Sequence, residues 1–90
     1  MIRRLLVHGR VQGVWYRGWA VDTARALGLD GWVRNRRDGS VEILASGSDE
    51  AVALFTERCG RGPAAARVDR IHVEETDEAA PTGFEQRPTA

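Results

Sequence analysis

The chain has 90 residues, 42% of them apolar and 29% charged, a balance typical of one small globular domain. Thirteen arginines offset thirteen acidic residues and lysine is absent, so the charge gives no indication of a nucleic-acid or membrane partner and lysine-based covalent chemistry is excluded. The single cysteine excludes an internal disulfide, and neither a membrane-spanning run nor a signal peptide is present. We therefore predict one domain over residues 1–90 and a cytoplasmic location.

The first predicted strand runs over Ile2–His8 and contains the apolar run Leu5-Leu6-Val7. The glycine-punctuated stretch Gly9–Arg17 follows and leads into a helical pattern. A loop of this kind can aim several backbone N–H groups at one point, at the positive end of the helix dipole. We expect an anion to bind here, with Arg17 in the first helical turn adding a fork of donors that matches phosphate oxygens.

The first helix is predicted to begin at Trp15 or Tyr16 and to end at Leu27, with Gly28 as a left-handed stop. Its apolar face is formed at helical spacing by Tyr16, Ala20, Ala24 and Leu27. Trp15 and Trp19 are expected to pack against the domain. The alternative is that one of them borders the anion site and contacts an organic substrate.

Two further strands are predicted around a hairpin. Leu29–Asn35 is followed by Arg36–Gly39, in which Asp38 and its glycine neighbour are typical of a tight turn. Ser40–Ser46 comes next and alternates clearly. The apolar residues Val41, Ile43 and Ala45 interleave with Glu42, Leu44 and Ser46, a pattern that predicts a sheet with one face on a core.

The second helix is predicted to begin after Ser48, which can cap it, and to end at Gly60. Its buried face is expected to comprise Ala51, Val52, Leu54, Phe55 and Cys59. A fourth strand, Val68–Glu74, should turn Ile71 and Val73 towards the core. Phe84–Arg87 could form a short edge strand before Pro88.

The predicted order is strand, helix, strand, strand, helix, strand. This order matches an α+β, ferredoxin-like βαββαβ sandwich: an antiparallel sheet with two helices on one face, and a possible short fifth strand at the C-terminus. The anion loop then follows the first strand. Asn35, which ends the second strand, must come near the loop if the two strands flank each other or share a neighbour.

Asn35, the only asparagine, is a candidate for orienting a water molecule against a bound phosphate. Phosphoryl transfer needs mostly positioning and charge neutralisation, and a neutral amide can hold water without repelling phosphate. The alternative is that Asn35 simply ends its strand before the hairpin. No metal-ligand spacing, Walker-type phosphate loop or serine nucleophile motif occurs, so we expect neither metal nor cofactor.

Two stretches together resemble the acylphosphatase family. They are Gly9-Arg10-Val11-Gln12-Gly13-Val14-Trp15-Tyr16-Arg17, and Gly31-Trp32-Val33-Arg34-Asn35 with the following Arg36-Arg37-Asp38-Gly39-Ser40-Val41-Glu42. The resemblance extends to Phe84-Glu85 and so covers nearly the whole chain. It implies a small ferredoxin-like enzyme that hydrolyses the carboxyl-phosphate bond of acyl phosphates without metal or cofactor.

The resemblance also implies roles for individual residues. Arg17 matches the family arginine that binds phosphate, and Asn35 matches the asparagine that orients the attacking water. The phosphate-cradling loop corresponds to Arg10, Val11, Gln12, Gly13, Val14, Trp15 and Tyr16. In the family the substrate phosphate is thought to accept the proton of the water.

The chain departs from the family pattern at two places. Trp15 stands where the family commonly has a smaller residue, which could narrow the site or change which acyl group fits. The last strand, Phe84–Arg87, carries fewer alternating apolar residues than usual, so a short or frayed edge is expected.

Other functions stay open at this stage. Ferredoxin-like domains also serve as binding modules, but the first and third strands lack the aromatic residues on which RNA bases stack. Related domains act on carbamoyl phosphate within longer chains, and the end at Ala90 favours a free-standing enzyme. We expect a monomer that acts on small acyl phosphates and binds inorganic phosphate or similar anions, without nucleic acid or membrane.

Overall fold

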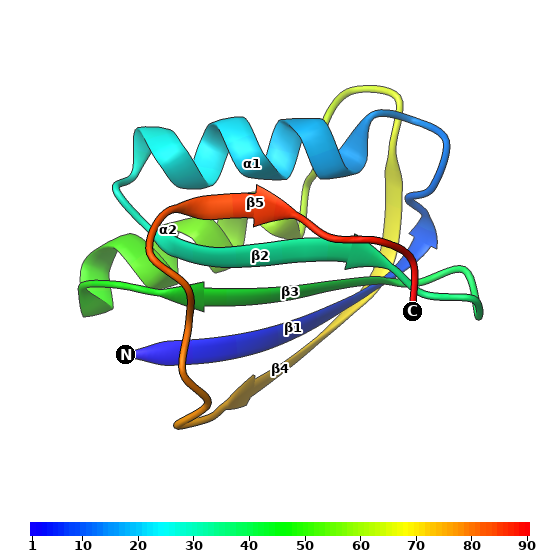
Figure 1. Cartoon of the computed structure of the whole chain (residues 1–90). Coiled ribbons are helices and arrows are strands. Elements are labelled where there is room, and N and C mark those ends of the chain that lie inside the picture. Colours follow the sequence, from blue (N-terminus) through cyan, green and yellow to red (C-terminus); the bar gives the residue numbers. More distant parts are fainter.

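The computed structural model describes all 90 residues. Its elements are β1 (Ile2–Arg10), α1 (Tyr16–Ala26), β2 (Asp30–Asn35), β3 (Val41–Ser46), α2 (Asp49–Cys59), β4 (Arg67–Glu75) and β5 (Phe84–Gln86). Figure 1 shows both helices on the same side of one sheet. Each helix has 11 residues, and neither is long enough to cross a membrane.

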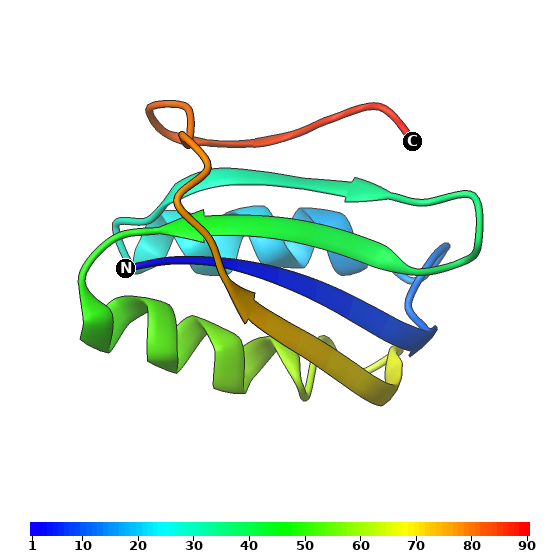
Figure 2. The same cartoon turned by 90° about the horizontal axis from the view of Figure 1, so that it is seen from below.

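The five strands lie in the order β4-β1-β3-β2-β5. The ferredoxin-like fold predicted from the element order is confirmed, but the sheet is mixed rather than wholly antiparallel. β5 runs parallel to β2, with Phe84 beside Gly31, whereas every other pair is antiparallel. The reason is the path of the chain after β4. Residues 76–83 cross to the far edge of the sheet, so β5 enters from the end at which β2 begins (Figures 1 and 2).

The main core lies between the helices and the sheet. Ala20 and Ala24 are fully buried on α1, where their small side chains let the helix lie close to the strands. Two predictions about helix ends are confirmed. The side chain of Ser48 accepts a hydrogen bond from the N–H of Ala51 at the start of α2, and Gly28 has φ +70° just beyond α1. Sixteen buried side chains form the core: Leu5, Val7, Val11, Tyr16, Ala20, Val21, Ala24, Leu29, Val33, Val41, Ile43, Ala45, Val52, Phe55, Cys59 and Phe84.

Of the predicted core residues, Leu27, Ala51 and Ile71 are partly buried against this core, and two others lie outside it. Leu54 and Val73 are each 38% exposed. Leu54 projects about 100° around α2 from the fully buried Phe55, which turns it away from the sheet. Val73 belongs to β4, an edge strand with a neighbour on one side only. An apolar residue at a strand position therefore does not imply burial at the margin of a small domain.

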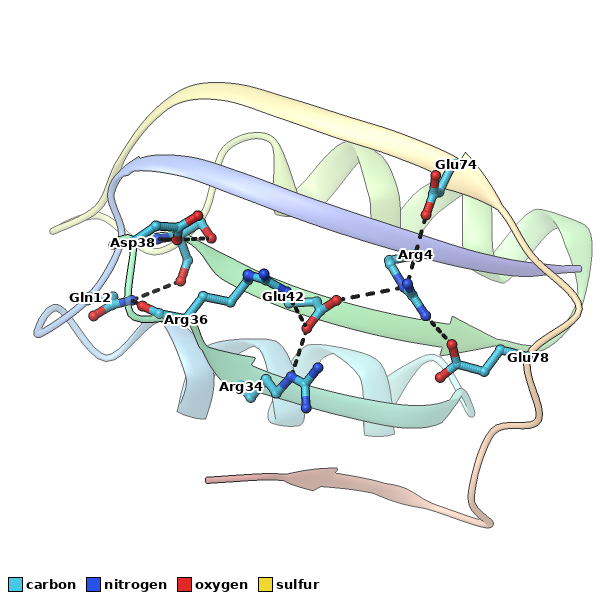
Figure 3. Close-up of polar contacts among 9 residues, drawn as sticks. Arg4, Gln12, Arg34, Arg36, Asp38, Glu42, Glu74 and Glu78 are labelled. Carbon is cyan, nitrogen blue, oxygen red and sulfur yellow. Dashed lines mark hydrogen bonds and ion pairs between the residues drawn. The ribbon is translucent and has the colours of Figure 1, made fainter. Parts of the chain in front are cut away.

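The opposite face of the sheet is also covered in its centre. Glu42, Leu44 and Trp32 point to this face, yet each is at most 3% exposed. The segment after β4 crosses here, and Glu78 on this segment pairs with Arg4 of β1 (Figures 2 and 3). The alternation in β3 correctly predicted which residues face the helices, but the prediction of one covered face was incomplete.

Gly9 lies at an irregularity near the end of β1, just before the next loop. The pairing of β1 with β4 is irregular between His8 and Gly9, and Gly9 adopts φ +132°. A Cβ atom at this position would lie 2.1 Å from the carbonyl oxygen of Arg67, so no other residue fits without displacing β4. β1 continues to Arg10, two residues beyond the predicted end, and the loop starts at Val11.

Candidate active site

The loop that joins β1 to α1 presents a run of unpaired backbone donors. None of the five N–H groups from Val11 to Trp15 donates to another group of the protein. Gly13 and Trp15 adopt left-handed φ values of +74° and +65° between residues of ordinary backbone conformation. Alternation of this kind turns successive N–H groups towards one side and forms an anion-binding concavity. The start of α1 adds the positive end of its dipole.

A pocket of about 140 Å³ opens beside this loop. Its lining comes from the loop, the first turn of α1, the end of β2 and the end of β5. The lining residues are Val11, Gly13, Trp15, Tyr16, Arg17, Gly18, Asn35 and Gln86. The pocket therefore brings together Arg17 and Asn35, which are 18 positions apart in the sequence and were both predicted as site residues.

Arg17 and Asn35 both enter the pocket with unused hydrogen-bonding capacity. The guanidinium of Arg17 makes no hydrogen bond or ion pair with any other residue, although nine ion pairs are present in the molecule. The Oδ1 atom of Asn35 is buried and has no hydrogen-bond partner. A buried amide oxygen without a partner is costly to stability, so this atom is a strong indication of a polar ligand or water in the pocket.

The backbone of Asn35 is held from both sides. Asn35 pairs with Val41 in the sheet, and its carbonyl oxygen accepts the N–H of Ala90 at 3.0 Å. The chain beyond β5 thus continues alongside β2, where Arg37 also donates its N–H to the carbonyl of Ala90. These contacts fix the strand end and leave only the side chain of Asn35 free to interact in the pocket.

Gln12 connects the loop to the hairpin that follows Asn35. Its Nε2 atom donates to the carbonyl oxygens of Arg36 and Ser40, each at 2.8 Å (Figure 3). Both donors of the amide group are used, and the contact spans 24 and 28 positions of sequence. Gln12 therefore does not line the pocket but sets the distance between the N–H groups of the loop and the end of β2.

The hairpin is itself fixed by Asp38. The hydroxyl and the N–H of Ser40 donate to Oδ1 of Asp38 at 2.6 and 2.9 Å. These two hydrogen bonds hold the pKa of the Asp38 carboxyl below its usual range, so the turn carries a negative charge at neutral pH. The prediction that Asp38 serves the turn is confirmed by this geometry.

Tyr16 anchors the first residue of α1 beneath the loop. Its ring is 1% exposed, and its hydroxyl donates to the carbonyl oxygen of Cys59 at the end of α2, at 2.6 Å. Burial strongly raises the pKa of Tyr16, and it raises the pKa of the Cys59 thiol to about 12. Both groups stay protonated at neutral pH, so neither is available as a base or a nucleophile.

Trp15 occupies the rim of the pocket rather than the core. Its side chain is 63% exposed and lines the pocket, so the expectation that it packs against the domain is wrong, and the alternative, that it contacts an organic substrate there, stays a prediction. Trp19 does pack, with its ring centroid 5.3 Å from that of Tyr16. The difference follows from the left-handed backbone of Trp15, which lies just before α1 and turns its side chain outward.

The other predicted loop residues fall into two groups. Val11, Gly13, Trp15 and Tyr16 line the pocket, whereas Arg10, Gln12 and Val14 do not. Arg10 belongs to β1 and is exposed, and Val14 packs against the core. Two lining residues, Gly18 and Gln86, were missed. Nothing in the local pattern marks Gln86, because its place depends on β5 lying beside β2.

On the face of the sheet away from the helices, three arginines converge on one buried carboxylate. Glu42 has a side chain 4% exposed and accepts Arg34 Nε at 2.7 Å and Arg36 Nη1 at 3.3 Å, while Arg4 Nε lies 3.7 Å away (Figure 3). Trp32 lies beside them, with the guanidinium carbons of Arg34 and Arg87 at 4.7 and 5.1 Å from its ring centroid. These charged groups already have partners within the fold.

The pocket has the chemistry of an anion site, and two side-chain amides in its lining, those of Asn35 and Gln86, could bind a second polar ligand. Donors are supplied by the loop and by Arg17, and Asn35 contributes an amide from the opposite wall. The lining contains no carboxylate or histidine. No group of three or more His, Cys, Asp or Glu side chains that could hold a metal ion occurs in the structure.

Known proteins are similar to this chain in sequence and in fold. A model of the Acylphosphatase family matches residues 3–86. An acylphosphatase of Rhizorhabdus wittichii is 55% identical over 87 residues, which cover 97% of this chain and 88% of the relative. Among solved structures, an acylphosphatase from Bacillus subtilis is 38% identical with a TM-score of 0.90, covering 97% of this chain and 99% of the other. One from Coxiella burnetii is 34% identical with a TM-score of 0.91, covering 96% and 90%.

Proposed function

Because the chain belongs to the acylphosphatase family, we propose that the pocket beside the β1–α1 loop is its active site, in which Arg17 holds the phosphate and Asn35 orients the attacking water. The enzyme hydrolyses the carboxyl-phosphate bond of acyl phosphates to a carboxylate and inorganic phosphate. The observation that carries the proposal is that Asn35, whose buried Oδ1 has no hydrogen-bond partner, lines the same pocket as Arg17, which forms no ion pair.

Phosphate binding is assigned to the loop and to Arg17 acting together. The N–H groups from Val11 to Trp15 have no acceptor in the protein, and phosphate oxygens supply acceptors of the right charge. The guanidinium of Arg17 can bond two of these oxygens with parallel N–H donors. Because the donors are fixed before substrate arrives, they stabilise the additional negative charge of the transition state with little reorganisation.

Water activation is assigned to Asn35. Its Oδ1 accepts a hydrogen bond from the water and directs the water oxygen at phosphorus, opposite the bond to the acyl oxygen. A new P–O bond forms while the bond to the carboxylate breaks, and the carboxylate leaves with the bonding electrons. The water proton passes to a phosphate oxygen. No basic side chain is then needed, in agreement with a lining that has no carboxylate or histidine.

Measurement of phosphate release from benzoyl phosphate, with a chelator present, tests these roles. The Asn35→Ala variant should lose about 100-fold in kcat while KM changes little, because a misplaced water costs rate but not phosphate binding. Competitive inhibition by inorganic phosphate provides the control and should persist in the variant. Full turnover by folded Asn35→Ala would show that water is positioned by another group.

We propose that the substrates are small acyl phosphates. We also propose that the protein acts as a monomer and does not bind nucleic acid. A binding module for single-stranded RNA is the competing function. Of the three arginines that could contact an RNA backbone, Arg34 and Arg36 already bond Glu42, whereas Arg37 is exposed and forms no ion pair. The loss of two of the three contacts favours the enzyme over the RNA-binding module. A titration with single-stranded RNA at increasing salt tests this point: tight binding that persists at high salt would contradict it.

A further inference from the structure

A second hollow adjoins the active-site pocket at Trp15. This hollow has a volume of about 390 Å³ and lies between α1 and β5. Trp15, Gly18 and Gln86 line both hollows, so a molecule that leaves the phosphate pocket on this side passes the indole of Trp15. In an acyl phosphate only one oxygen separates phosphorus from the acyl carbon, so the acyl group of a bound substrate lies at the rim of the phosphate pocket, of which Trp15 forms one side.

The conformation of Trp15 is not explained by stability of the fold. The residue has φ +65°, an unfavourable region for any side chain larger than glycine, and its indole is 63% exposed. An apolar ring held in water by a strained backbone contributes little burial. Backbone strain of this kind is concentrated at active sites and at segments that hold ligands.

Gly18 fixes where the indole lies. A Cβ atom at position 18 would be 2.1 Å from Nε1 of Trp15 and 2.7 Å from its Cδ1. The indole therefore lies directly against the backbone of the first turn of α1, in space that only glycine leaves free. Glycine is otherwise a poor helix residue, so its presence here is accounted for by the ring that it accommodates.

The charges around the second hollow favour an uncharged occupant. Asp22 and Glu85 place two carboxylates on its lining, and Arg25 contributes one guanidinium, whose Nε is already bonded to the carbonyl of Phe84. An acyl group with its own carboxylate would meet this acidic margin. A flat, uncharged ring would meet Trp15, with which it can stack.

We propose that Trp15, held in place by Gly18, forms an acyl subsite that selects uncharged aromatic acyl phosphates over small aliphatic ones. This inference rests on the proposed placement of phosphate in the adjoining pocket. It assigns Trp15 a specificity role through contact with the substrate's acyl group, beyond the contribution of its backbone N–H to the loop.

The test compares kcat/KM for benzoyl phosphate and acetyl phosphate, each corrected for spontaneous hydrolysis. The ratio of the two values cancels any change in phosphate binding that affects both substrates. Trp15→Gly removes the ring and suits the left-handed backbone, so this variant should fold and should lose preference for benzoyl phosphate by about five-fold. Trp15→Phe retains an aromatic ring and should keep most of the preference.

Gly18→Ala provides a second variant that leaves residue 15 intact. Its methyl group must displace the indole, whereas alanine favours the helix, so the protein should fold and lose preference as Trp15→Gly does. An unchanged ratio in both Trp15→Gly and Gly18→Ala would overturn the acyl subsite alone. Failure of the parent enzyme to hydrolyse either compound above the uncatalysed rate would instead overturn the proposed active site.

Discussion

Three arginines on the sheet and one at the start of α1 differ in whether they have partners within the fold. On the sheet face away from the helices, Arg4, Arg34 and Arg36 surround the buried carboxylate of Glu42, and we call this set the Glu42 cluster. At the start of α1, Arg17 faces a pocket with no partner, beside backbone donors that also lack one. Arginines that are neutralised within the fold stabilise it, whereas an unpaired arginine at a helix start remains available to a ligand.

Of the changes that test this difference, removal of Arg17 should have the largest effect, and the effect should be on activity. Arg17→Ala should lower kcat/KM for acyl phosphates by about 1,000-fold, because a preorganised charge at the reacting phosphate is lost, while stability stays near that of the parent. Steady-state phosphate release and urea unfolding measure the two effects. Arg58→Ala is the matched control, since Arg58 is exposed on α2 and forms no ion pair. A comparable loss of activity in Arg58→Ala would contradict a special role for Arg17.

At the Glu42 cluster we expect a substitution to reduce stability, whereas at Arg17 it should reduce activity. Glu42→Ala leaves three converging guanidiniums without their common carboxylate and should lower the free energy of unfolding by about 3 kcal/mol. Urea denaturation measures this loss. Glu57→Ala, which breaks an exposed pair with Arg61, is the control and should cost less than about 1 kcal/mol. Equal stability of the two variants would show that the Glu42 cluster does not hold the sheet together.

Gln12 offers the smallest and most specific perturbation, because it links the loop to the hairpin next to Asn35. Gln12→Ala removes two hydrogen bonds and should lower kcat/KM by about ten-fold through loss of alignment. Gln12→Met fills a similar volume without donors and should lose activity to a similar extent. Parent-like kinetics in Gln12→Met would assign the effect to packing rather than to hydrogen bonding.

The order of elements and the position of the site could be predicted from local patterns. Glycines between an apolar run and a helical pattern marked the anion loop, and the chain order placed Asn35 near it. The direction of β5 could not be predicted, since three residues carry no information about which way a strand runs. Gln12 was assigned to the loop, but its contacts lie 24 and 28 positions away and leave no local signal.

Trp15 at the pocket and Glu42 on the sheet illustrate a second limit of prediction from the sequence. Local spacing gave Trp15 a packing role, yet its exposure depends on one left-handed backbone angle. Glu42 alternates with core residues as an exposed strand residue does. Its burial requires guanidiniums contributed by β1, β2 and the hairpin, an arrangement that only the assembled sheet provides.

Trp32, enclosed by Arg34 and Arg87, and Trp15, at the rim of the pocket, should differ in their fluorescence. Trp32 is 3% exposed and Trp15 is 63% exposed, so their indoles should emit at shorter and longer wavelengths respectively. Addition of phosphate should change the long-wavelength part of the emission, which arises beside the pocket, and leave the short-wavelength part unaltered. Unfolding of the sheet should shift the short-wavelength part instead. The native protein thus carries its own fluorescent reporters of ligand binding and of sheet integrity.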